Sequence, residues 1–211
     1  MKQLLTGHSA PTAKTSILWF RFLLNAIRRT GLDSQDIATS VGFDLTFLDN
    51  PDAYIQDEFT ALLLMAAVEK SANDTYGLKA GQYFVPSAFG PLGYAMMTSA
   101  DLRGALERTT YFTASVTDTT RTRMSYTGNS CLFEIQMPSY FPEVARVVDE
   151  FMMTSILTAF RWLVGFDFIP LSIEFMHEQP NDIAPYQKAF GRIPVFASQR
   201  CAFVFSNEQL D

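Results

Sequence analysis

Histidine, a side chain well suited to acid–base chemistry near neutral pH, occurs only twice in this chain of 211 residues. His8 falls in a polar N-terminal tail and His177 at the end of a predicted strand, so no set of nucleophile, base and orienting group can be argued. His177 is in phase with the apolar face of its strand, where a lone histidine is more often a hydrogen-bonded structural residue than a ligand contact. Neither histidine is placed on a helix near a pocket, as a haem ligand would be. We therefore predict that the chain is not an enzyme and holds no metal and no cofactor.

Two further pairs of residues could carry chemistry. Asp149 and Glu150 are adjacent carboxylates in a predicted helix, and adjacent helical positions point about 100° apart, so we expect a solvated edge rather than an acid–base pair. Cys131 and Cys201 lie in predicted strands and lack the close spacing of a zinc or redox pair. We expect both to be buried free thiols in a reducing compartment.

Phosphate and nucleic-acid binding are also disfavoured. The spacing of Gly77, Gly81 and Gly90 is close to that of a phosphate loop, but no Lys-Ser/Thr pair follows and no strand precedes, so we interpret these glycines as turn residues. The formal net charge is -6, and the 16 lysines and arginines are scattered along the chain. A nucleic-acid surface needs clustered basic residues, so we expect none on this polypeptide.

The bulk composition bounds the architecture. Hydrophobic residues make up 48% of the chain, enough to bury one full core. The N-terminus lacks the apolar region of a signal peptide, and no stretch reaches the roughly 18 apolar residues of a membrane span, so we predict a cytoplasmic protein with no membrane partner. We expect a flexible tail over residues 1–13 and a single domain over 14–211.

The first half of the chain is predicted to be helical. Apolar residues recur there at helical spacing, and glycine, proline or capping residues punctuate them. Helices are expected over residues 14–30, 34–42, 44–48, 56–71, 77–83, 92–97 and 101–115.

The period then changes to two. Residues 119–137 predict a β-hairpin with Gly128 and Asn129 at its tip. That tip places apolar pairs on one face and charged or polar pairs on the other: Tyr126 with Cys131, Met124 with Phe133 and Thr122 with Ile135, against Arg123 with Glu134 and Arg121 with Gln136.

The remaining sequence alternates between the two periods. A long helix is expected over 142–164, covering the apolar side of the hairpin, then a strand over 171–177, a helix over 182–190, and strands over 194–196 and 201–205. The predicted fold class is α+β: a helical N-terminal half followed by a β-β-α-β-α-β-β half, with one antiparallel sheet covered by helices.

Two blocks of sequence resemble a known family. The first is GPLGYAMMTSADLRGALE, residues 90–107, and the second is FMHEQPNDIAPYQKAFGRIPVFASQRCAFVFS, residues 175–206. GLDSQDIATSVGFDLTFLDNPDAYI, upstream, is also similar. Together they resemble the N-terminal effector-binding and dimerisation domain of AraC-type transcriptional regulators, in the branch that includes ornithine- and arginine-responsive activators. The second block matches the family pattern at Phe175, His177, Pro180, Tyr186, Phe190, Gly191, Pro194, Val195 and Phe196.

This resemblance implies a ligand sensor that forms a homodimer. In such regulators a C-terminal domain with two helix-turn-helix motifs normally follows, and this sequence ends at NEQLD, where the linker to it would begin. We therefore expect the DNA-binding domain to be absent from this chain, and DNA to be a partner only through that domain.

A small-molecule effector is expected between the long helix, the hairpin and the segment 90–112. The candidate ligand-binding residues provide aromatic or methionine surface and a few polar tips near that seam. They are Tyr94, Met97, Arg108, Tyr111, Phe112, Phe151 and Phe160.

Two classes of effector are compatible with the sequence. An amino-acid-like ligand needs an inward charge pair, for which Arg108 or Arg146 with Glu150 could serve, whereas an apolar or aromatic acid needs one cation and fits the 19 phenylalanines and 9 methionines. The sequence slightly favours the acid. The alternative is a ligand-free dimerisation module, which predicts no pocket of about 300 Å³ or more.

The helix over 14–30 is a possible dimer face. Trp19, Phe20 and Phe22 surround its axis more widely than one core stripe requires.

Overall fold

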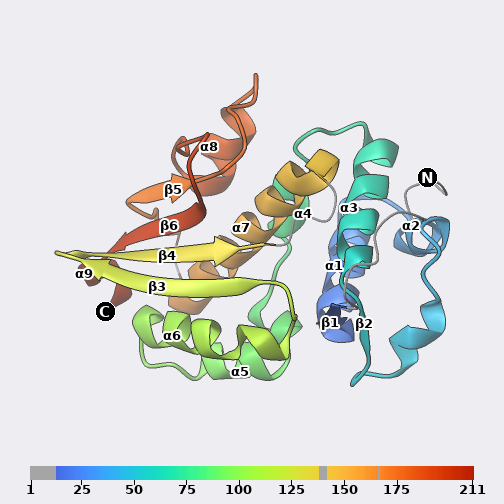
Figure 1. Ribbon diagram of the computed structural model, residues 1–211, viewed down its shortest axis with the longest axis horizontal. Coiled ribbons are helices and arrows are strands. Elements are labelled where there is room, and N and C mark those ends of the chain that lie inside the picture. Colours follow the sequence, from blue (N-terminus) through green and yellow to red (C-terminus); the bar gives the residue numbers. More distant parts are fainter. Residues whose placement is uncertain (1–12, 138–141, 166) are drawn as a thin grey trace.

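The computed structural model describes residues 13–137, 142–165 and 167–211. Two groups of elements lie on either side of one long helix, α7 (Figure 1). One group consists of β1 (Lys14–Ser16), α1 (Ile17–Arg29), α2 (Ser34–Ser40), η2 (Leu45–Asp49), β2 (Tyr54–Gln56), α3 (Glu58–Ser71) and α4 (Tyr76–Gly81). The other group contains β3 (Arg121–Thr127), β4 (Ser130–Gln136), β5 (Ser172–Glu174), α8 (Ala184–Phe190), β6 (Cys201–Ser206) and α9 (Asn207–Leu210). The helix between the two groups, α7, spans Pro142–Val164. The link between the groups is η3 (Pro86–Phe89), α5 (Pro91–Met97), α6 (Leu102–Phe112) and η4 (Thr113–Ser115).

The first half is helical, as predicted, with one correction. Residues 14–16 and 54–56 form a two-stranded antiparallel sheet in which Thr15 faces Ile55, so the helices expected from residues 14 and 56 begin later. The reason at the first site is a cap: Ser16 has extended backbone angles, and its hydroxyl accepts a hydrogen bond from the amide of Leu18. A helix cannot extend backwards through a residue in that conformation.

Side-chain caps also begin two other helices. The side chain of Asp33 accepts from the amides of Gln35 and Asp36, and that of Asp101 accepts from the amide of Gly104 at 2.8 Å. These bonds satisfy amides that the first helical turn leaves without partners, and so they fix where α2 and α6 begin.

The main sheet is four-stranded and antiparallel, in the order β3-β4-β6-β5. The predicted α+β class and the predicted hairpin register are confirmed, with Tyr126 opposite Cys131, Met124 opposite Phe133 and Thr122 opposite Ile135. One face of the sheet packs on α7, where the ring of Phe160 lies 5.8 Å from that of Phe133.

The strand prediction for 194–196 is wrong, and that for 171–177 is too long. Val195 makes a single parallel bridge to Glu174, and only Ser172–Glu174 forms a strand. Ala197 has a positive φ of 51°, which ends extended pairing, and its amide donates to the carbonyl of His177. The second half is therefore β-β-α-β-α-β before the short α9.

Gly77 and Gly81 are helix-packing residues, which corrects their interpretation as turn residues. Both lie in α4, where a Cβ on Gly77 would meet the carbonyl oxygen of Val147 at 2.4 Å and one on Gly81 would meet Cβ of Thr154 at 2.7 Å. Only glycine allows the backbone of α4 to approach α7 this closely.

Helix α1 is enclosed by its own chain, so the predicted dimer face is wrong. Trp19, Phe20 and Phe22 are 4%, 0% and 5% exposed. The indole of Trp19 stacks on Phe89, whereas the ring of Phe20 packs at 4.2 Å on Phe43. The aromatic residues that cover Trp19, Phe20 and Phe22 come from η3, from α7 and from the segment after α2.

Candidate functional site

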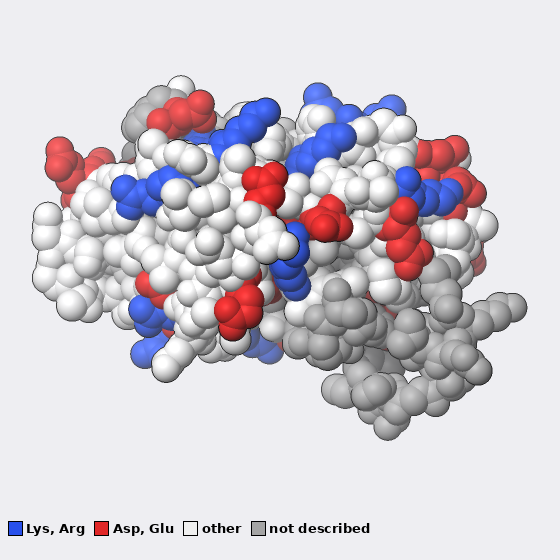
Figure 2. All heavy atoms as spheres, turned by 90° about the horizontal axis from the view of Figure 1, so that it is seen from above, with Lys and Arg blue, Asp and Glu red and all other residues white. Residues whose placement is uncertain are grey.

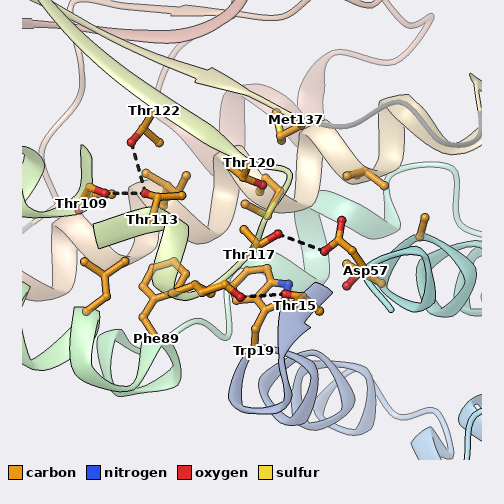
Figure 3. A pocket seen from close by; sticks show the side chains of 17 residues that line it. Thr15, Trp19, Asp57, Phe89, Thr109, Thr113, Thr117, Thr120, Thr122 and Met137 are labelled. Carbon is orange, nitrogen blue, oxygen red and sulfur yellow. Dashed lines mark hydrogen bonds between the residues drawn. The ribbon is translucent and has the colours of Figure 1, made fainter. Parts of the chain in front are cut away.

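A cavity of about 60 Å³ lies where β1, α1, α3, η3, α5, α6, η4, β3 and α7 meet (Figure 3). Much of its polar lining is threonine, and much of the rest is aromatic, aliphatic or methionine. The lining residues are Thr15, Trp19, Asp57, Thr60, Ala61, Phe89, Leu92, Thr109, Thr113, Val116, Thr117, Thr120, Thr122, Met137, Val148, Met152 and Ile156.

One polar wall of the cavity is a chain of hydroxyl groups. Thr109 and Thr113 are one helical turn apart, and their hydroxyls donate to the carbonyls of Ala105 at 2.8 Å and Thr109 at 2.5 Å. The hydroxyl of Thr122 lies 3.3 Å from that of Thr113 (Figure 3). Because the hydrogen of Thr113 is already donated to a carbonyl, Thr122 is the donor in this contact.

A second polar group joins the two parts of the chain. The hydroxyls of Thr117 and Thr119 contact the two carboxylate oxygens of Asp57 at 3.3 Å and 2.7 Å, and Asp57 is 9% exposed. The hydroxyl of Thr15 donates to the carbonyl of Val116 at 3.3 Å. These bonds connect β1 and the start of α3 to the segment that leads into β3.

The apolar wall comes from several helices. Trp19 and Phe89 stack at 5.4 Å between ring centroids, and Met152 and Ile156 of α7 close the opposite part. Thr60, 8% exposed on α3, interrupts this apolar surface with a hydroxyl oxygen that has no hydrogen-bond partner among the described residues. A buried, unpartnered hydroxyl costs free energy, so it marks a position where a ligand atom or a water would be stabilised.

One side chain among the described residues that line the cavity is charged. Asp57 contributes a carboxylate, and the described lining includes no lysine, arginine or histidine. Across the described parts of the chain, no three His, Cys, Asp or Glu side chains are arranged to hold a metal ion. The arrangement is suited to holding a small molecule by hydrogen bonds and apolar contacts.

None of the seven residues predicted for ligand binding lines this cavity. Tyr94, Tyr111 and Phe112 are 65%, 80% and 41% exposed on the α5–α6 pair. The guanidinium of Arg108 donates to the carbonyl of Ala95 at 2.6 Å, which joins these two helices. Partly buried Met97 is also on α5.

The other two predicted residues are buried in the core. Phe151 packs against Trp19 and Phe22, and Phe160 packs against the sheet. Their role in ligand binding stays a prediction. The signal that could have located the cavity is the density of threonines over residues 109–122, which the emphasis on aromatic side chains overlooked.

A second polar cluster is buried between α7 and α8. Glu150 is 0% exposed, and its Oε1 accepts from Nε of Arg146 at 2.7 Å and from the hydroxyl of Tyr186. Burial raises the pKa of Glu150, and its other oxygen, Oε2, has no partner among the described residues. The predicted solvated edge is therefore wrong for Glu150, because α4 and α8 cover this side of α7.

Its neighbour Asp149 is also largely covered. Burial raises the pKa of Asp149 to about 6, although the thiol of Cys201, 3.5 Å from Oδ2, acts in the opposite direction. Burial raises the pKa of Cys201 to about 12. Cys131 and Cys201 are both buried and free, as predicted.

His177 makes the hydrogen bond expected of a structural residue. Its Nδ1 lies 2.9 Å from the carbonyl of Glu178, to which it donates, and its ring packs against Phe175 and Phe196. Burial lowers its pKa, and Nε2 has no partner among the described residues.

The surface offers no large region of one charge on the face seen from above in Figure 1. Figure 2 shows acidic and basic side chains interspersed there. Within the described residues, no helix combines the length and apolar character that a membrane crossing requires.

Comparison with known proteins gives a consistent result. Residues 31–211 match the family model described as the arabinose-binding domain of AraC transcription regulator, N-terminal. Uncharacterized HTH-type transcriptional regulators of Mycobacterium bovis and Mycobacterium tuberculosis are each 28% identical over 145 residues, which is 66% of this chain and 41% of the relative. The matched region thus spans less than half the length of those relatives.

A solved structure supports the fold. The transcriptional regulator CdpR from Pseudomonas aeruginosa superposes with a TM-score of 0.61 at 14% identity, covering 92% of this chain and 56% of CdpR. The family and these similar proteins are transcriptional regulators rather than enzymes.

Proposed function

The chain belongs to the family of arabinose-binding N-terminal domains of AraC transcription regulators, and on that premise we propose that it is a homodimeric sensor whose effector binds in the threonine-lined cavity. DNA is contacted by a separate helix-turn-helix domain of the whole protein. The assignment of effector binding to this chain and of DNA binding to a separate domain agrees with the names of the similar regulators and with the net charge of -6 on the present chain.

The position of the cavity is the observation that carries this proposal. Its lining comes from elements on both sides of α7, including Thr15 and Asp57 from the first group and Thr120 and Thr122 from the hairpin. A ligand there contacts both groups at once, so it stabilises one relative arrangement of them over others. Such differential binding is the thermodynamic requirement for an effector that shifts a conformational equilibrium.

A thermal-shift screen of small metabolites tests the site. Ala61, 7% exposed on α3, lines the cavity, so Ala61→Leu fills part of it, and Ala100→Leu adds the same atoms at an exposed position. An effector of this cavity raises the melting temperature of the wild type and of Ala100→Leu but not of Ala61→Leu. Equal shifts in all three proteins would place binding elsewhere.

For the homodimer, we propose the α5–α6 face. Arg108, Tyr111 and Phe112 are neighbours on one side of α6, since residues three and four apart lie on the same face, and Arg108 reaches the residue next to Tyr94. Exposed aromatic side chains are enriched at protein interfaces. In this proposal, four of the residues predicted from sequence to bind the ligand, Tyr94, Arg108, Tyr111 and Phe112, contact the second copy of the chain instead.

The size of the cavity favours one alternative. About 60 Å³ is well below the roughly 300 Å³ at which ligand pockets usually begin, as expected of a dimerisation module without an effector. That alternative predicts a stable dimer in sedimentation and no cavity-dependent hit in the thermal-shift screen. A small molecule whose binding is saturable and is abolished by Ala61→Leu contradicts the ligand-free alternative.

A further inference from the structure

We propose that the cavity selects a small molecule without negative charge, whose head group donates hydrogen bonds from a compact apolar body: an amine or an alcohol. This inference rests on the proposed function, because it names the ligand class of the same cavity. It replaces the acid that the sequence slightly favoured.

The hydrogen bonds of the lining threonines have a common direction. A threonine hydroxyl has one hydrogen to donate and two lone pairs that accept. The hydrogens of Thr109 and Thr113 are donated to backbone carbonyls, and that of Thr122 is donated to Thr113. These three hydroxyls therefore offer lone pairs to any molecule in the cavity.

Thr15 and Thr117, two further threonines of the described lining, repeat this pattern. Thr15 donates to the carbonyl of Val116. Thr117 donates either to Asp57 or to Thr119, and in both arrangements its hydrogen is occupied. Five of the seven threonines in the described lining therefore offer lone pairs and no free hydrogen, and the natural complement of those five is a group that donates.

The charges of the described lining residues also disfavour an acid. Asp57 adds a carboxylate to the lining, and the described lining residues include no basic side chain. A carboxylate ligand would leave water without gaining a cation, and burying an unpaired charge is costly. An ammonium group would donate to the acceptors without adding negative charge beside Asp57, and a neutral hydroxyl would donate to them without any charge.

The hydroxyl of Thr60 lies on the cavity wall without a hydrogen-bond partner among the described residues. An alcohol oxygen can accept its hydrogen, and an ammonium or hydroxyl hydrogen can be donated to its oxygen. A ligand head group thus satisfies a buried polar atom of the protein, which a purely apolar molecule cannot do.

The apolar part sets the size of the body. The cavity, with a volume of about 60 Å³, is small, and Trp19, Phe89 and Ile156 are among the residues that bound it. A branched four-carbon skeleton fits this space better than a long chain or a fused ring.

Three molecules with the same skeleton isolate the effect of the head group: isobutylamine, isobutanol and isobutyrate. Each is titrated at pH 7 and constant ionic strength into the whole chain carrying ¹³C-labelled methionine methyl groups. Met137 and Met152 line the cavity and report binding there, whereas Met97 and the exposed Met176 serve as internal controls.

We expect saturable shifts of the Met137 and Met152 methyl signals with the amine or the alcohol. The dissociation constant for isobutyrate should be at least about tenfold weaker, a difference of about 1.4 kcal/mol. Thr60→Val, which keeps the side-chain shape, should weaken the amine or alcohol several-fold.

The outcomes separate the two proposals. Isobutyrate binding as tightly as the amine and the alcohol, with shifts confined to Met137 and Met152, overturns the ligand class and leaves the sensor site standing. No saturable shift of Met137 or Met152 with any of the three, or shifts limited to Met97 and Met176, overturns the cavity as the site and with it the premise.

Discussion

The hydroxyl of Tyr186 donates a hydrogen bond to the carboxylate of Glu150 in the core, and this bond connects α8 to α7 across 36 positions of sequence. Arg146, one helical turn before Glu150, donates to the same oxygen at 2.7 Å. The ion pair makes burial of the carboxylate tolerable, and the tyrosine fixes where α8 packs.

Tyr186→Phe should lower the free energy of unfolding by about 2 kcal/mol, because it removes a hydrogen bond to a fully buried carboxylate. Tyr54→Phe is the matched control, since the hydroxyl of Tyr54 donates to the carbonyl of Ser115 at 3.0 Å on the surface. Its loss should cost about 0.5 kcal/mol or less. Urea denaturation of both variants measures the difference in the free energy of unfolding. Equal losses in the two variants would mean that the buried hydrogen bond stabilises the fold no more than the exposed one.

Asp149→Asn should change how stability depends on pH. The pKa of Asp149 is raised from 3.8 to about 6 in the folded chain, so folding favours its protonated form. Stability from this group is fully present below pH 3.8 and is lost as the pH rises through about 6. Relative to the wild type, the variant should therefore gain about 2 kcal/mol between pH 4 and pH 7. A difference that is constant over this range in denaturant titrations would contradict the raised pKa.

Gly77→Ala and Gly81→Ala should each destabilise the fold by about 2 kcal/mol or more. The added methyl group would lie within 2.4 Å of the Val147 carbonyl at Gly77 and within 2.8 Å of the Phe151 carbonyl at Gly81, so α4 must move away from α7. Gly104→Ala is the control, because its nearest neighbour is the side chain of Asp101 at 3.3 Å and alanine favours the helix there. Thermal unfolding of the three variants provides the comparison. A control as unstable as the other two would show that the loss of glycine itself, and not the close approach of α4, is responsible.

Thr60→Val should stabilise the protein by about 1 kcal/mol, because it replaces a buried hydroxyl that has no partner among the described residues by a methyl group of the same shape. Thr109→Val should have the opposite sign, since the hydroxyl of Thr109 donates to the Ala105 carbonyl at 2.8 Å. Denaturant midpoints measured side by side decide the point. Destabilisation by both changes would show that Thr60 is hydrogen-bonded in solution, for example to a bound water.

Tyr111→Asp should dissociate the proposed homodimer, because it places a charge in the centre of the α5–α6 face. Tyr111 is 80% exposed in the chain, so the fold itself should keep its melting temperature within a few degrees. Sedimentation equilibrium measures the change, with Met176→Asp, at a 58% exposed position away from α5 and α6, as the control. A dimer that survives Tyr111→Asp but not Met176→Asp would move the interface to the C-terminal segment.

Local features of the fold were predictable from sequence. The hairpin register follows from its two-residue tip and the alternation of apolar side chains, and the start of α6 follows from Asp101, whose side chain reaches an amide three residues away. Each of these depends on residues close in the chain. The strand expected at 194–196 failed for the opposite reason, because the pairing there involves a distant segment: the amide of Ala197, whose φ is 51°, donates to the carbonyl of His177.

The candidate site was beyond such reasoning. Thr117 and Asp57 are 60 positions apart, and nothing in their local sequences shows that they share a hydrogen bond. The same holds for Glu150, whose helical neighbours predict exposure and whose burial depends on α4 and α8 arriving from elsewhere.

By itself, then, the sequence determined the α+β class, the hairpin and the family resemblance, because periodicity, turns and motif order are properties of neighbouring residues. Only the tertiary structure decided which side chains surround the cavity, that the hydroxyl hydrogens of Thr109, Thr113 and Thr122 are already donated, and that α1 is enclosed. Those properties depend on the directions in which distant segments meet, and the free energy that selects them comes from packing over the whole core.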